Sequence, residues 1–148
     1  MTMLRLSTTA ALIGLLTSAF TACSARPRVI DIHAINYAFQ APTSTPPGLV
    51  QFRLLNEGTV DHEVQLFRFR PGITGAAAAS LLRGASFPDS AYAGSGGVLI
   101  APAGQTAHET LVVPLVAGEV YGLRCEFRDS ASLPAHSQMG MWAVLEVH

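Results

Sequence analysis

Hydrophobic and polar residues alternate along much of this chain in short runs separated by turn-forming residues. The clearest run is 29–34, where Ile30 and Ile32 fall on one face of an extended chain, with Asp31 and His33 on the other. A period of two is typical of a half-buried β-strand. The same criterion, together with flanking Gly, Pro and Asn residues, predicts further strands at 49–55, 62–69, 98–101, 106–113, 119–127 and 142–147.

One stretch departs from this period. Thr74 is a suitable N-cap, residues 76–82 favour a helix, and Gly84 can end it. Residues 84–97 are rich in Gly, Ser and Ala and predict a loop. About eight strands with one short helical excursion indicate an all-β fold, a Greek-key β-sandwich or barrel.

The N-terminal residues 1–25 have the features of a secretory signal peptide. A short, weakly positive start precedes an apolar stretch at 6–20, which is too short to predict a transmembrane helix. Small residues then precede Cys23 and resemble a bacterial lipobox, although Phe20 stands where Leu, Val or Ile is usual. We therefore expect export to the periplasm or cell envelope, with Cys23 carrying a lipid anchor in a bacterial membrane. The alternative is ordinary cleavage after Ala25, which would discard Cys23.

The remaining residues, 26–148, have the usual size of one domain with one core. Hydrophobic residues make up 49% of the chain and charged residues 13%, which excludes a disordered chain or a coiled coil. The formal net charge is -1 and all nine basic residues are Arg. No basic or acidic run therefore predicts a nucleic-acid partner or a highly charged one.

Four residues with metal-binding side chains follow in the order His62, Cys125, His136 and Met141. A thiolate, two imidazoles and a weak thioether are the donors of a mononuclear type 1 copper site. If the strands that carry His62 and Cys125 are antiparallel, the beginning of one and the end of the other meet at one pole. The loop 128–140 would then have to bring His136 back over that pole.

Each of these residues also has an alternative interpretation. Taken alone, Cys125 could be a buried structural thiol or a nucleophile, although no catalytic signature surrounds it and we predict no enzyme. His62 could be a core histidine bonded to a carbonyl, and His136 a solvated loop residue. Met141 could belong to the core, and Met139 competes with it as the axial donor. The other histidines, His33, His108 and His148, do not belong to such an ordered set of metal-binding side chains.

Several motifs resemble the cupredoxins, small blue-copper proteins of the plastocyanin and azurin kind. The resemblance covers roughly residues 30–147 and depends on 56–58 before His62, on 121–125, and on 136–141, where four residues separate His from Met and Gly precedes Met. It implies a cupredoxin-like domain with one type 1 copper bound by the four residues named above. It also implies that electrons enter or leave at His136, beside Pro134 and Ala135.

The chain departs from that family in two places. Ten residues separate Cys125 from His136, whereas plastocyanin has two, and Glu63 follows His62 where many cupredoxins have Asn or Asp. The predicted function is that of an exported, monomeric copper protein that transfers electrons to or from a redox protein partner. Two alternatives stay open: a binding or assembly domain without a redox metal, and a protein for copper capture or delivery.

Overall fold

The computed structural model describes residues 26–84 and 88–148. The predicted signal peptide and the predicted lipidation site Cys23 lie outside these residues. Within the described ranges, no helix is long and apolar enough to span a bilayer.

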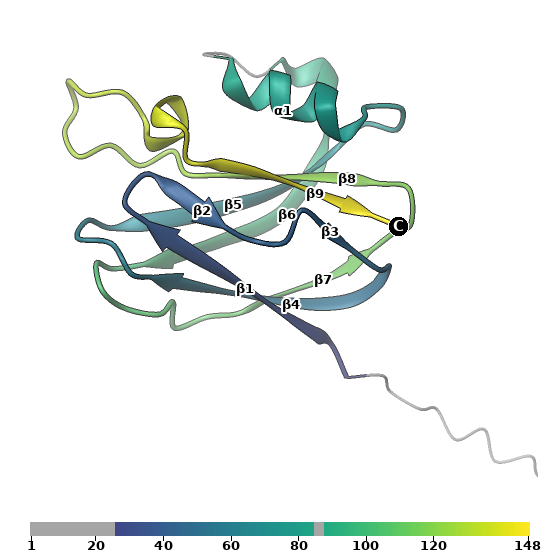
Figure 1. The fold of residues 1–148 in the computed structure, drawn as a ribbon, viewed down its shortest axis with the longest axis horizontal. Coiled ribbons are helices and arrows are strands. Elements are labelled where there is room, and N and C mark those ends of the chain that lie inside the picture. Colours follow the sequence, from purple (N-terminus) through teal and green to yellow (C-terminus); the bar gives the residue numbers. More distant parts are fainter. Residues whose placement is uncertain (1–25, 85–87) are drawn as a thin grey trace, which may run out of the picture.

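Two β-sheets pack face to face, as Figure 1 shows. One has the order β2-β1-β4-β7 and consists of β1 (Arg28–Ile35), β2 (Ala38–Gln40), β4 (Gly48–Asn56) and β7 (Leu111–Leu115). The other has the order β3-β9-β8-β5-β6 and consists of β3 (Ser44–Thr45), β5 (His62–Phe69), β6 (Tyr92–Ala101), β8 (Val120–Arg124) and β9 (Trp142–Val147). The pairs β1–β4 and β3–β9 are parallel and the others antiparallel. This arrangement confirms the predicted all-β sandwich.

The core lies between the two sheets, where the alternating apolar residues meet. Ile30 and Ile32 of β1 are buried, and Asp31 on the other face pairs with Arg53 of the neighbouring β4. Each fully buried Ile, Leu or Phe contributes roughly 1.5–3 kcal/mol. The fully buried large apolar side chains that fill this space are Ile32, Val50, Phe52, Leu54, Val64, Leu66, Leu123, Met141 and Leu145.

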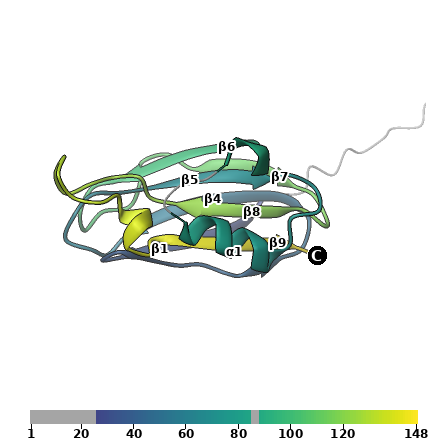
Figure 2. The ribbon, with the colours of Figure 1, turned by 90° about the horizontal axis from the view of Figure 1, so that it is seen from above.

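The helix predicted between Thr74 and Gly84 is confirmed as α1 (Gly75–Arg83), which is one residue longer at each end than the predicted run 76–82. Thr74 is the N-cap, its hydroxyl accepting a hydrogen bond from the Ala77 N–H, and Gly84 follows the last turn. Figure 2 shows α1 lying across β8 and β9, on the face of their sheet that points away from the core. Ala78 and Leu82 are the helix residues buried there, in a second cluster that also contains Phe67, Phe69, Ala91 and Val120.

The loop predicted for 84–97 is partly wrong. A short 3-10 helix, η1 (Asp89–Ala91), leads into β6, which pairs with β5 from Tyr92 onward. The glycines that suggested a loop serve a β-bulge instead, because the β5–β6 register shifts opposite Leu66 and Phe67, and Gly97 has φ +125°. Glycine can therefore interrupt a strand pattern without ending the strand.

Two other predicted strands have different ends. The strand predicted at 106–113 begins later and ends later, as β7 (Leu111–Leu115). Before it, Thr106 forms an isolated β-bridge with Leu55. Strand β7 extends through Pro114 because it lies at a sheet edge, where a missing N–H is tolerated. Strand β8 ends at Arg124, before the predicted limit at residue 127, because the chain turns there to surround the candidate site.

Candidate metal centre

The structure brings His62 and Cys125 together at one pole of the sandwich. His62 is the first residue of β5 and Cys125 directly follows β8. These strands pair antiparallel, with Gln65 opposite Arg124, so the start of one lies beside the end of the other. The predicted reason for their proximity is therefore confirmed.

His136 reaches the same pole from the long loop after Cys125. It begins a short 3-10 helix, η2 (His136–Met139). The His136 N–H donates to the Phe127 carbonyl at 2.8 Å, and the Ser137 N–H donates to the Cys125 carbonyl at 2.7 Å. These two backbone bonds fold η2 back onto the chain beside Cys125.

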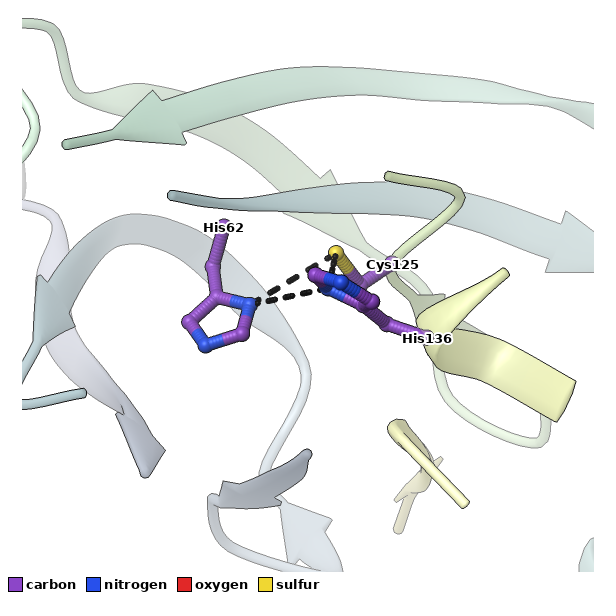
Figure 3. Close-up of side chains that lie close together, drawn as sticks. All are labelled: His62, Cys125 and His136. Atoms are coloured by element: carbon purple, nitrogen blue, oxygen red, sulfur yellow. Dashed lines mark hydrogen bonds between the residues drawn. The ribbon is translucent and has the colours of Figure 1, made fainter. Parts of the chain in front are cut away.

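The three candidate ligand atoms converge on a common point (Figure 3). Cys125 Sγ lies 3.4 Å from His136 Nδ1 and 3.9 Å from His62 Nδ1, and the two Nδ1 atoms are 3.2 Å apart. A metal bound at about 2.0 Å to each nitrogen and about 2.3 Å to sulfur would hold such donors roughly 3.3–3.7 Å apart. The donor set and its spacing therefore fit one metal ion. Among the described residues, this is the one cluster of His, Cys, Asp and Glu side chains with such spacing.

Burial determines the protonation preferences of the cluster. The side chains of His62, Cys125 and His136 are at most 1% exposed. Burial raises the pKa of Cys125, while N–H groups of Glu63 and Phe127 oppose this by favouring the thiolate. A bound cation would favour the thiolate far more strongly. Without a metal, burial therefore favours the neutral thiol at neutral pH.

His62 is likewise favoured in its neutral form, which is the form that binds metals. Burial lowers the pKa of His62 and His136 lowers it further, against smaller opposing effects of Asp129, the Asn36 backbone and Asp61. Among the described residues, His62 Nε2 has no hydrogen-bond partner of ordinary geometry, although the Asn36 backbone favours the charged ring. Its Nδ1 faces the other two donors.

The backbone of Met141 is hydrogen-bonded to the backbone of both His136 and Cys125. Its N–H donates to the His136 carbonyl at 3.0 Å, and its carbonyl accepts from the Cys125 N–H at 3.1 Å. The Met141 side chain is fully buried, whereas Met139 on η2 is 40% exposed. This burial favours Met141 over Met139 as an axial donor, and its ligation stays a prediction.

Glu63, which stands where many cupredoxins have Asn or Asp, links the start of β5 to the chain around Cys125. Its backbone N–H donates to Cys125 Sγ at 3.5 Å. Its buried carboxylate accepts from the Glu126 N–H at 3.1 Å and from Gln65 Nε2 at 2.9 Å. One residue therefore holds both the sulfur and the start of the ligand loop.

Asn56 holds the turn before His62. Its buried amide donates to the Val60 and Ala101 carbonyls at 2.8 and 3.0 Å and accepts from the Gly58 N–H at 2.9 Å. Sequence inspection placed Asn56 in a motif but gave it no role. The structure shows that it fixes the segment that delivers His62 to the site.

Two residues beside His136 were missed from the sequence. The Asp129 carboxylate lies 3.0 Å from His136 Nε2, and the Tyr37 hydroxyl donates to its other oxygen at 2.5 Å. The Tyr37 hydrogen bond is the main cause that lowers the pKa of Asp129. The only sign of this contact in the sequence is that Asp129, an acidic residue, lies in the unusually long loop between Cys125 and His136. Because His136 is 1% exposed, its ring is covered, and its predicted role in admitting electrons stays a prediction.

Comparisons with known proteins place the fold. Neither a known family model nor a curated protein sequence matches the chain. Three solved structures are similar over 84% of the chain: a dithionite-reduced auracyanin from Roseiflexus castenholzii (TM-score 0.53, 20% identity, 99% of that chain), auracyanin B (0.52, 22%, 91%) and reduced rusticyanin (0.54, 15%, 81%).

These neighbours are cupredoxins, and the chain has the cupredoxin fold. The predicted resemblance is thus confirmed at the level of the fold, and the His62, Cys125 and His136 cluster lies where β5 begins and β8 ends, at one end of the sandwich.

Proposed function

We propose that this protein binds one copper ion and transfers single electrons. The observation that carries the proposal is the convergence of one thiol and two imidazole nitrogens, all buried, at spacings that suit one metal ion. The cupredoxin fold supports it, as do the reduced states in which an auracyanin and rusticyanin were described. Copper bound there would supply a one-electron couple between Cu(II) and Cu(I).

The residues of this chain provide a preformed, dry binding site. His62, Cys125 and His136 would bind the ion, and Met141 would approach as the axial donor. The antiparallel pairing of β5 with β8 places His62 and Cys125 side by side. The Glu63 N–H donates to Cys125 Sγ, and the Asn56 amide bonds the turn before His62 to the Ala101 carbonyl. Ligands fixed in this way move little between oxidation states, which favours fast electron exchange.

We also propose that a redox protein partner docks at the metal-centre pole. Leu133, in the loop between Cys125 and His136, and Met139, on η2, are exposed there and offer apolar contact to a partner. Strand β1 begins at Arg28 and runs toward Asn36 and Tyr37 beside the site, so the described chain starts at the opposite pole (Figure 1). A lipid anchor at Cys23 would then leave the metal centre facing away from the membrane.

Addition of Cu(II) to the domain tests the central proposal. We expect one equivalent to bind and to produce an intense visible thiolate-to-copper band. Cys125→Ser should abolish the band, and Ser137→Thr, which keeps the adjacent hydroxyl, should retain it. A wild-type protein that stays colourless with Cu(II) would contradict the proposal and favour a domain without a redox metal.

Export and anchoring need a separate test. Expression of the full chain in a bacterium should place it in the membrane fraction, and mass spectrometry should find an acylated Cys23. Cys23→Ala should release the protein from that fraction. A soluble product that begins at Arg26 would instead indicate ordinary cleavage after Ala25.

A further inference from the structure

The loop between Cys125 and His136 builds a second layer over the metal centre. Asp129 lies in this loop and approaches His136 Nε2 to 3.0 Å with Oδ1. Tyr37, from the turn between β1 and β2, donates to Oδ2 of the same carboxylate. The Tyr37 ring also meets the His136 ring edge-on, with centroids 5.0 Å apart. Two segments 92 positions apart in sequence therefore hold one carboxylate against the far nitrogen of a candidate ligand.

The chemistry of these three groups determines which nitrogen of His136 carries hydrogen. At neutral pH an Asp carboxylate only accepts hydrogen bonds, and the Tyr37 hydroxyl already donates to one of its oxygens. A hydrogen bond to Asp129 therefore requires hydrogen on His136 Nε2. In the neutral ring, Nδ1 then carries a free lone pair, and it is Nδ1 that lies 3.4 Å from Cys125 Sγ.

We propose that Asp129, held by Tyr37, is a positioning residue that fixes His136 in the Nε2–H tautomer and strengthens Nδ1 as a metal donor. This inference rests on the proposed copper site. A carboxylate that accepts from a ligating imidazole orients the ring and raises its basicity. A more basic nitrogen stabilises Cu(II) more than Cu(I), so the Tyr37–Asp129 pair lowers the reduction potential. The long loop thus has a function: it carries the carboxylate that completes the site.

The first experiment needs no metal. Nitrogen-15 NMR of the imidazoles at pH 8, where an ordinary imidazole is neutral, reports the tautomer directly. We expect His136 to be Nε2–H in the wild type and a mixture of tautomers in Asp129→Asn, whose amide can donate as well as accept. An Nδ1–H or doubly protonated His136 ring in the wild type would overturn the inference, whether or not copper binds.

The second experiment measures copper affinity and reduction potential. Asp129→Asn should weaken Cu(II) binding by about 10- to 100-fold and raise the potential. Tyr37→Phe should shift both in the same direction but less, because the carboxylate remains. Asp61→Asn is the matched control: it removes one negative charge near the same cluster, but Asp61 accepts from the Ala103 N–H and not from His136.

These outcomes separate the two proposals. Equal shifts in Asp129→Asn and Asp61→Asn would mean that charge alone acts, and would overturn the positioning role. A wild-type protein that shows the expected tautomer but binds no copper would contradict the proposed function and leave the role of Asp129 in orienting the ring. Asp129→Glu, which restores a carboxylate, should recover part of the affinity lost in Asp129→Asn.

Discussion

The candidate metal centre has two halves that are held in different ways. His62 is the first residue of β5 and Cys125 directly follows the neighbouring β8, so the hydrogen-bond ladder between these strands fixes the chain on which both are placed. His136 lies on a short 3-10 helix at the end of a long loop, and individual bonds from Phe127, Ser137 and Asp129 fix it. The strand-borne half therefore depends on the stability of the whole fold, whereas the loop-borne half depends on a few local contacts.

The largest effect should come from the core under the strand-borne half. Leu123 of β8 is 1% exposed, and Leu123→Ala should reduce the free energy of unfolding by about 2–5 kcal/mol through lost burial and a cavity. The control is Leu133→Ala in the ligand loop, where the side chain is 46% exposed and the change should stay within about 0.5 kcal/mol. Denaturant unfolding measures both. Similar losses in the two variants would contradict the contrast between the halves.

Asn56→Ala tests the turn that delivers His62. It leaves the partly buried Val60 carbonyl, the buried Ala101 carbonyl and the Gly58 N–H without their partner, which should cost about 1–3 kcal/mol in the free energy of unfolding. Asn56→Asp keeps the acceptor for the Gly58 N–H but loses both donors. Because His62 follows this turn, the visible copper band of Asn56→Ala should also broaden. A stable variant with an unchanged spectrum would show that the ladder alone positions His62.

Glu63→Gln tests the charge that lies between the halves. The amide retains an oxygen that can accept from the Glu126 N–H, so the free energy of unfolding should fall by only about 1 kcal/mol. The negative charge near Cys125 is removed, which should favour Cu(I) and raise the reduction potential measured by voltammetry. Glu63→Asp, which keeps the charge on a shorter side chain, is the comparison. A lower potential in Glu63→Gln would contradict this account.

Ser137→Ala should give the smallest effect on stability. It removes the hydrogen bond from the Ser137 hydroxyl to the Glu126 carboxylate, which in this partly exposed setting should contribute only about 0.5 kcal/mol. We expect faster loss of copper to a chelator, because η2 carries His136. Ser130→Ala removes a hydroxyl of the same loop that bonds the Ser132 hydroxyl, and should leave that rate unchanged. Equal rates in the two variants would show that this contact does not hold the loop-borne half.

The same contrast explains what the sequence could reveal. Alternation predicted the strands that carry His62 and Cys125, and antiparallel pairing predicted their meeting, because both follow from a short repeating pattern. The contacts of Glu63, Tyr37 and Asp129 depend on the path of a particular loop, which no local periodicity encodes. The glycines at 94–97 misled for a related reason, since their role in a β-bulge is defined only by the partner strand β5. The clustering of His62, Cys125 and His136 was predictable, and the residues that hold them in place were not.

The most direct test of the central claim is X-ray absorption at the copper edge on the protein loaded with one equivalent of Cu(II). The account predicts two nitrogen donors and one sulfur donor at about 2.0–2.3 Å, with the sulfur lost in Cys125→Ser. A copper shell of nitrogen and oxygen donors alone in the wild type would contradict it.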